Sequence, residues 1–228
     1  WQFVPKLDGH LKDRNQEKHH PFETITNIAG QPNQLRALLL TGTIMLGHFS
    51  IIPFISPYLT ANVGFSEKNL YLIYAVGGAL TLFTAPQVGK LADRKGKYPV
   101  FVVFALLSMI PMWLITNMNT NYLPAVLGAT TIFFVFSNGR LIPTQAMISS
   151  VVLPKQRGSF LAINTSLQLL MQSVAVYLAG FVIQKTPEGK LLHYDWVGYA
   201  AMSIIFVSVF IARTVKPVDV LVKEVVGE

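Results

Sequence analysis

The sequence predicts an all-α membrane protein with six transmembrane helices, and three observations support this fold class. Hydrophobic residues make up 52% of the chain and charged residues only 13%, whereas charged residues make up about 25% of an average soluble domain. The apolar residues gather into runs long enough to cross the ~30 Å hydrocarbon core of a bilayer. Short polar connections separate these runs, and most of the Lys and Arg residues lie in the connections.

The polar residues divide the chain into three parts. Residues 1–34 contain no run able to span, and we expect them to form the end of a preceding helix and a cytoplasmic linker. Residues 35–212 are expected to form the six-helix transmembrane domain, and residues 213–228 a cytoplasmic tail. The predicted spans cover residues 35–59, 69–88, 98–115, 122–152, 159–183 and 196–212.

The first two spans carry helix-perturbing residues. Pro53 and Pro57 lie near the far end of the first span. Because proline removes a backbone donor, we expect a kink or local unwinding there. In the second span, Gly77 and Gly78 leave a smooth face that favours close contact with another helix.

The last four spans differ in polarity. The third and sixth spans are almost entirely apolar and are predicted to face lipid. The fourth and fifth contain polar side chains within their apolar runs. In the fourth span these are Asn138, Arg140, Thr144 and Gln145. In the fifth they are Asn164, Gln168 and Gln172, which recur every four residues and therefore share one helix face.

The distribution of Lys and Arg predicts the orientation. In this scheme Lys68, Lys185 and Lys190 lie on one side of the membrane and Arg140 lies inside it. All the other Lys and Arg residues lie on the opposite side, together with both ends of the chain. Positively charged loops stay in the cytoplasm, so both ends are expected to be cytoplasmic, in an integral cell membrane protein.

Several function classes are disfavoured. The formal charge of +7 resides at span ends and not along a stripe with interleaved aromatic residues, so we expect no nucleic-acid partner. The chain has no cysteine, and no cluster of metal ligands suggests a metal or another cofactor. It also lacks the H-E-x-x-H and G-x-S-x-G motifs and paired intramembrane aspartates. We therefore expect the protein not to be an enzyme.

Two ionisable residues fall inside the spans. Arg140 lies too deep to reach water easily, and such residues usually face a cavity or a partner. The alternative is a structural arginine that binds carbonyl groups freed near Pro143. His48 is the intramembrane side chain that could titrate near neutral pH; it could carry a proton or form a hydrogen bond to a neighbouring helix. No Asp or Glu lies inside any span.

The polar face of the fifth span has two interpretations as well. Asn164, Gln168 and Gln172 could line a path for a solute. They could instead join helices, because amide hydrogen bonds between membrane helices contribute about 1 kcal/mol each. We favour the path, or an interface between this helix and another half of the same protein.

The connection from Gly89 to Lys97 is the most charged segment of the apolar region. We expect a tight turn bracketed by Gly89 and Gly96, with Asp93 balancing the surrounding cations. The segment resembles the loop signature of the major facilitator superfamily, G-x-L-a-D-r-x-G-r-k-p. The matching positions are Gly89, Leu91, Ala92, Asp93, Arg94, Gly96, Lys97 and Pro99. The alternative is a basic loop that only fixes membrane topology.

Other segments extend the resemblance to the drug and sugar efflux branch, the arabinose-efflux-like permeases. They are 56–59, 62–64, 138–143, 157–158 and 164–168. Transporters of this superfamily have two six-helix halves of inverted three-helix repeats. The resemblance implies that this chain is the second, C-terminal half. It also implies that the first and fourth spans line the cavity and that the second and fifth meet the missing half.

The resemblance further implies export of a small organic solute, drug or sugar-like, by proton antiport with alternating access. The polar residues expected to line the path are His48, Asn138, Arg140, Gln145, Asn164, Gln168 and Gln172. Gly89, Asp93, Arg94, Gly96 and Arg157 would form a cytoplasmic gating motif, in which Asp93 binds Arg157 and the start of the fifth span. The expected partners are solute, protons, the lipid bilayer, and either the missing half or a second copy. The alternative is a six-helix scaffold or sensor that transports nothing.

Overall fold

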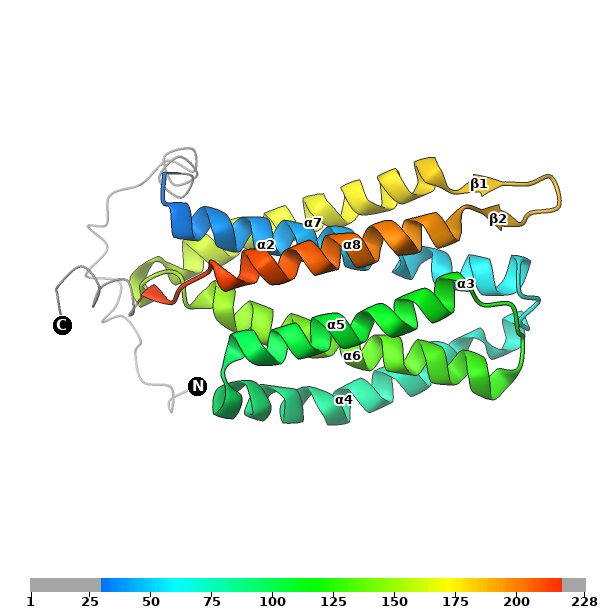
Figure 1. The fold of residues 1–228 in the computed structure, drawn as a ribbon, viewed down its shortest axis with the longest axis horizontal. Coiled ribbons are helices and arrows are strands. Elements are labelled where there is room, and N and C mark those ends of the chain that lie inside the picture. The colour runs from blue at the N-terminus through cyan, green and yellow to red at the C-terminus, as the bar shows by residue number, and fades with distance from the viewer. Residues whose placement is uncertain (1–29, 219–228) are drawn as a thin grey trace, which may run out of the picture.

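A computed structural model describes residues 30–218, which fold into a bundle of long helices (Figure 1). Six helical segments of this part are long and apolar enough to cross a membrane. The elements are α2 (Pro32–Phe49), α3 (Ile52–Ala61), η2 (Glu67–Asn69), α4 (Leu70–Lys95), α5 (Lys97–Thr116), α6 (Leu123–Ser149), η3 (Pro154–Gln156), α7 (Arg157–Val182), β1 (Gln184–Lys185), β2 (Leu191–Leu192) and α8 (Tyr194–Arg213). The predicted six-helix membrane fold is confirmed. The expected linker and tail lie largely outside the described residues.

The helices pack as two groups of three, α2 with α7 and α8, and α4 with α5 and α6 (Figure 1). Each group combines helices from both halves of the chain. The first repeat comprises α2 with α3, α4 and α5, and the second comprises α6, α7 and α8. Helix α2 of the first repeat packs on α7 and α8 of the second, and α6 of the second packs on α4 and α5 of the first. Contact between α5 and α8 joins the groups. This exchange is the pattern of two three-helix repeats, as expected for one half of a major facilitator fold.

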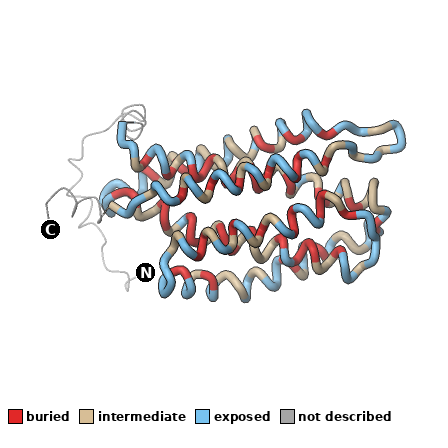
Figure 2. Tube along the Cα trace, viewed as in Figure 1, coloured by how far each residue is buried: buried red, intermediate tan, exposed pale blue. Residues whose placement is uncertain are grey.

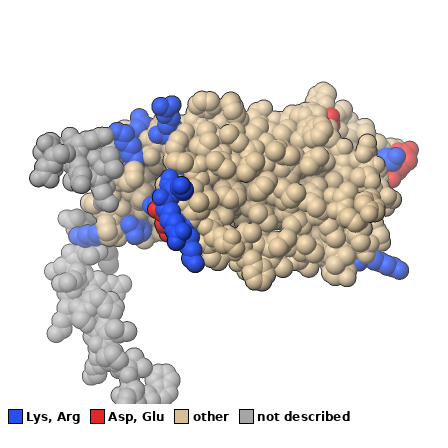
Figure 3. All heavy atoms as spheres, turned by 60° about the horizontal axis from the view of Figure 1, so that its bottom comes forward, with Lys and Arg blue, Asp and Glu red and all other residues tan. Residues whose placement is uncertain are grey.

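The two ends of the bundle differ in charge. We call the end that carries residues 30 and 218 the terminal end, and the end that carries the β1–β2 turn the hairpin end. Lys and Arg gather at the terminal end (Figure 3). The exposed cations there are Arg36, Lys90, Arg94, Lys95, Lys155, Arg157, Arg213 and Lys216, whereas Lys68, Lys185 and Lys190 lie at the hairpin end. This asymmetry agrees with the charge distribution expected from the sequence.

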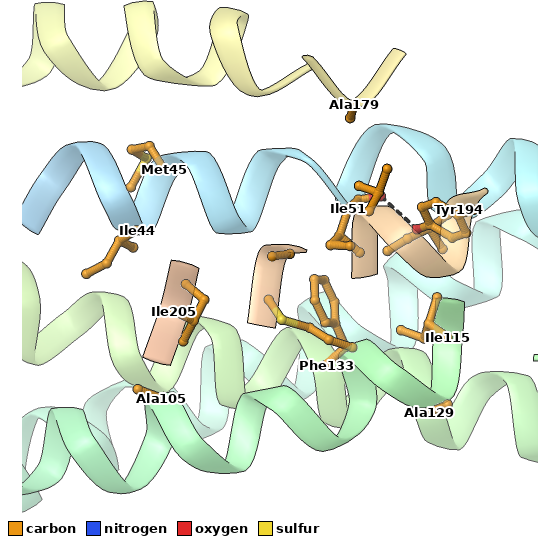
Figure 4. Packing of buried hydrophobic residues seen from close by; sticks show 14 of the residues in the cluster. Ile44, Met45, Ile51, Ala105, Ile115, Ala129, Phe133, Ala179, Tyr194 and Ile205 are labelled. Carbon is orange, nitrogen blue, oxygen red and sulfur yellow. Dashed lines mark hydrogen bonds between the residues drawn. The ribbon is translucent and has the colours of Figure 1, made fainter. Parts of the chain in front are cut away.

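The first span is broken, as its prolines predict. Helix α2 ends at Phe49 and α3 begins at Ile52, so the helix is interrupted just before Pro53, although Ser50 and Ile51 keep right-handed helical dihedral angles. Pro57 lies inside α3 without interrupting it. The hydroxyl of Tyr194 donates a hydrogen bond to the carbonyl of Ile51 at the break, at 2.9 Å (Figure 4). The same carbonyl accepts a hydrogen bond from the Phe54 N–H at 3.1 Å, so both a side chain and the following turn bond to the break.

The Gly89–Lys97 connection differs from the expected turn. Helix α4 continues through Gly89 to Lys95, and α5 begins at Lys97. The reversal therefore takes place at Gly96, where φ is +94° and only glycine is unstrained. The expectation that Gly89 brackets the turn is wrong. The residues between the glycines include Leu, Ala, Lys and Arg, which favour a helix once it has left the bilayer.

The core is formed where the two groups meet (Figures 2 and 4). Glycines allow the closest helix approaches. A Cβ added to Gly47 of α2 would lie 2.7 Å from Ile205 of α8, and one added to Gly77 of α4 would lie 2.5 Å from Phe134 of α6. A Cβ on Gly139 of α6 would overlap Phe104 of α5. Within lipid the hydrophobic effect does not drive helices together. Close van der Waals packing at such small residues stabilises their association instead.

Candidate functional site

The candidate site is a buried polar centre where α2, α5 and α6 meet. Arg140 of α6 is 0% exposed, and His48 of α2 is 6% exposed. The Nη1 of Arg140 donates to the Oγ of Ser108 on α5 at 2.7 Å. The Nη2 of Arg140 lies 3.3 Å from the Nδ1 of His48. Because a guanidinium can only donate, Nδ1 is the acceptor and the histidine proton resides on Nε2.

Two glycines place these side chains. His48 follows Gly47, and Arg140 follows Gly139. Each glycine receives a side chain from a helix that packs on its own, Ile205 on Gly47 and Phe104 on Gly139. His48 and Arg140 therefore occupy similar positions on the first helices of the two repeats, next to a close helix crossing. Their contact joins α2 to α6 across the boundary between the two groups.

Aromatic rings enclose the histidine. The ring of His48 stacks on Phe133 of α6 with centroids 5.9 Å apart and an interplanar angle of 14°. Phe49 meets it edge-on at 5.2 Å. These contacts fix the plane of the imidazole beside Arg140.

The guanidinium has only neutral partners. In residues 30–218 the acidic side chains are Glu67, Asp93, Glu188 and Asp195, all in loops or in the terminal turns of helices. The Nε of Arg140 and the Oγ of Ser137, one turn earlier on α6, are buried and have no hydrogen-bond partner in this part of the chain. A buried arginine is normally paired. The centre therefore combines a cation with unsatisfied polar groups.

The predicted path residues do not all converge on this centre. Asn164 is buried and accepts a hydrogen bond from Thr41 of α2 at 2.6 Å, so it joins α7 to α2. The side-chain Nε2 of Gln172 lies 3.7 Å from the sulfur of Met45, which is also on α2. The amide of Asn138 donates to its own helix, at the carbonyl of Phe134. In the described chain the side chains of Gln145 and Gln168 make no hydrogen bond; Gln145 is exposed and Gln168 half-buried.

Sequence reasoning missed Ser108. The third span was predicted to face lipid, and its outer face is indeed apolar and exposed at Val103, Ile110 and Trp113. Its inner face packs in the core, and Ser108 there is fully buried. A single serine in an otherwise apolar run was the available signal. Its spatial partner on α6 could not be identified from spacing alone.

The expected gating residues lie at the terminal end. Asp93 and Arg94 are exposed on the last turns of α4, and Arg157 is exposed at the start of α7. The carboxylate of Asp93 forms no hydrogen bond or ion pair with any residue from 30 to 218, so the expected Asp93–Arg157 contact is absent from this conformation. The carboxylate instead borders a cavity of about 430 Å³, which also contacts Lys97 and Val215.

Known proteins resemble the chain along much of its length. A family model described as "Major Facilitator Superfamily" matches residues 37–226. The chain is also similar to the Multidrug resistance protein MdtG of Escherichia coli, from strains K12 / DH10B, SE11 and 55989 / EAEC, with 29% identity over 134 residues in each case. The match covers 56% of this chain and 31% of each relative. The chain thus aligns with about a third of the length of the curated relatives it matches. No solved structure matches it significantly.

Proposed function

The chain belongs to the major facilitator superfamily, whose model matches more than half of its length, and from this membership we propose that it is the C-terminal half of a secondary active transporter. The transporter exports a small organic solute, drug or sugar-like, by proton antiport with alternating access. The multidrug resistance name of the similar proteins supports export as the direction. The chain is an integral multi-pass membrane protein with six spanning helices.

The observation that carries the proposal is the His48–Arg140 contact. It joins the first helices of the two repeats, α2 and α6, deep in the bundle. Polar groups inside a membrane bundle usually mark a pathway, since they are costly there. In the proposed mechanism a solute or proton reaches this centre when the helices separate. His48 is the proposed proton carrier, because the acidic side chains of residues 30–218 all lie in loops or in the terminal turns of helices.

The remaining path residues extend the proposed site. Asn138 and Gln145 lie on α6, and Asn164, Gln168 and Gln172 lie on α7. The hydrogen bond from Thr41 to Asn164 supports a joining role for that residue in the closed bundle. Gln145 and Gln168 are free to bind a solute or the opposite half.

The uncovered helices support a missing partner. The least buried spans are α4 and α7. Their exposed faces contain small residues, including Gly78 on α4 and Ser166 and Ser173 on α7, which favour helix contact. We propose that these faces meet an N-terminal six-helix half or a second copy of the chain. The short match to the relatives supports the first partner.

The cations support an orientation with the terminal end in the cytoplasm (Figure 3). The proposed location is the cytoplasmic membrane. The gating motif of Gly89, Asp93, Arg94, Gly96 and Arg157 then lies on the cytoplasmic side. The absence of an Asp93–Arg157 contact supports a gate that is not engaged in this conformation.

A reconstitution experiment tests the proposal. The chain is purified alone and together with a candidate first half, and its mass in nanodiscs is measured. Liposomes containing each preparation are then given a pH gradient and a fluorescent drug-like dye. We expect a stable pair in which dye movement and proton flux are coupled. His48→Gln keeps a hydrogen-bond acceptor for Arg140 but should abolish proton coupling. A rate of dye movement that does not depend on the pH gradient would contradict antiport.

Full burial of Arg140 favours the alternative of a non-transporting scaffold or sensor. In that case Arg140, His48 and Ser108 would only join three helices. A chain that stays monomeric, moves no dye with any partner and keeps a cysteine at position 140 inaccessible in every condition would establish this alternative. The family membership favours a carrier and not an enzyme.

A further inference from the structure

The side chain of Asn62 holds the β1–β2 hairpin by a two-point contact. Asn62 follows the last residue of α3. Its Nδ2 donates to the carbonyl of Leu191 at 2.8 Å, and the backbone N–H of Leu191 donates to its Oδ1 at 2.8 Å. A carboxamide presents one donor and one acceptor side by side, which matches the two backbone groups of a single residue. This contact joins segments 129 residues apart.

The same arrangement recurs at the opposite end of the same helices. Asn33, in the first turn of α2, donates to the carbonyl of Lys216 at 2.7 Å and accepts from the Lys216 N–H at 3.0 Å. The Asn33 contact is exposed, whereas the Asn62 contact is partly buried. Hydrogen bonds strengthen as water is excluded. The Asn62 pair should therefore be the stronger, and the Asn33 pair is a matched control.

The hairpin has few other attachments. Each strand has two residues, both residues of β1 are exposed, and the turn between the strands passes through Gly189 at φ +86°. The last turn of α7 is exposed at Phe181 and Val182. The partly buried Leu191 packs against the core, and Ile183 before β1 and Tyr194 after β2 are buried in it. Between these two anchors the Asn62 pair ties the strands to the end of α3.

Helix α3 is fastened on its other side to the opposite group. The hydroxyl of Tyr58 donates to the carbonyl of Met118, after α5, at 3.1 Å. The hydroxyls of Ser56 and of Tyr74 on α4 lie 2.7 Å apart. If the Asn62 pair breaks, these contacts keep α3 with α4 and α5. The hairpin and the adjoining end of α7 are then the parts that can move away.

We propose that Asn62 and Leu191 form a latch that holds the hairpin end of the bundle closed. Its release separates the end of α7 and the hairpin from α3, the outer part of the broken first span. Asn62 is thus a positioning residue. The role of this opening in solute passage rests on the proposed transport function, whereas the latch itself does not.

Two reporters and two latch variants test the proposal. The chain has no cysteine, so a single one can be introduced without background. Ala179→Cys reports on the hairpin end, and Ala37→Cys on the terminal end; the two alanines are 3% and 0% exposed. Each reporter is combined with Asn62→Ala or Asn33→Ala in nanodiscs, and the rate of reaction with a water-soluble maleimide is measured.

We expect Asn62→Ala to accelerate labelling at position 179 roughly tenfold, as the loss of two hydrogen bonds implies, and to leave position 37 unchanged. Asn33→Ala should leave position 179 unchanged. Equal rates at position 179 with and without Asn62→Ala would overturn the latch. Equal acceleration of both reporters would also overturn it, because that result means general destabilisation.

A second variant of similar size guards against misfolding. Asn62→Asp keeps the acceptor for the Leu191 N–H but sets a carboxylate oxygen against the Leu191 carbonyl, so labelling at position 179 should rise as well. An unchanged rate in Asn62→Asp, if Asn62→Ala does not fold, rejects the latch. Labelling requires no transport, so failure of the proposed function and failure of the latch give different results.

Discussion

Arg140 shows how one residue organises the interior. Burying a guanidinium in a membrane costs about 2.5–3.5 kcal/mol on insertion scales. Its partners Ser108 and His48 come from two other helices, so the cost is offset only when α2, α5 and α6 are assembled together. The arginine therefore favours one arrangement of these helices over others.

Replacing Ser108 should test this role. Ser108→Ala leaves the Nη1 of Arg140 without its hydroxyl acceptor, and an unsatisfied buried donor costs about 1–3 kcal/mol. We expect the thermal unfolding midpoint in detergent to fall. Ser208→Ala is the control, because among residues 30–218 the fully buried hydroxyl of Ser208 bonds only to the carbonyl of Ile205 in its own helix. Equal midpoints for the two variants would show that Ser108 does not support the arginine.

At the scale of the helices, glycines determine where two helices cross closely. Within the described chain, several helices meet at a glycine: α2 with α8 at Gly47, α4 with α6 at Gly77, and α5 with α6 at Gly139. The backbone can approach there because no Cβ intervenes. The glycines thus let α8 approach α2 closely, and let α4 and α5 approach α6 closely.

A pair of glycine substitutions measures this effect. A Cβ at Gly139 would overlap the ring of Phe104, so Gly139→Ala should destabilise the bundle by about 1–3 kcal/mol through overpacking. Nothing lies within 4 Å of a Cβ at Gly78. Gly78→Ala should therefore be neutral or stabilising, since alanine favours a helix by about 1 kcal/mol. Unfolding of both variants is compared in the same detergent. A stable Gly139→Ala protein would mean that α5 and α6 can move apart freely.

At the scale of the whole molecule, the described chain is closed around its own core but uncovered on α4 and α7. The charged turn between α4 and α5 lies at the terminal end, beside the cavity of about 430 Å³. Asp93 is unpaired there among residues 30–218. An unpaired carboxylate beside a cavity is available to a partner that arrives during a conformational change.

Asp93→Asn follows from this position. Because the carboxylate has no partner in the described chain, its replacement should change the free energy of unfolding by no more than about 0.5 kcal/mol, as at other exposed sites. If Asp93 gates the cytoplasmic side, the variant should slow dye export severalfold in the reconstituted pair while solute affinity stays unchanged. Gln87→Asn, an exposed change earlier on α4, is the control. Normal export by Asp93→Asn would reject the gating role.

The sequence by itself determined the six spans, a perturbed helix near Pro53, the charge asymmetry and the presence of His48 and Arg140 within apolar spans. These features depend on composition and local spacing, because a bilayer requires apolar length and internally bonded backbone from each span separately. The tertiary structure decided which residues meet. The contact of Arg140 with Ser108, the hold of Asn62 on Leu191 and the separation of Asp93 from Arg157 join or part distant positions. Such pairings depend on how the repeats exchange helices, and no local pattern encodes that exchange.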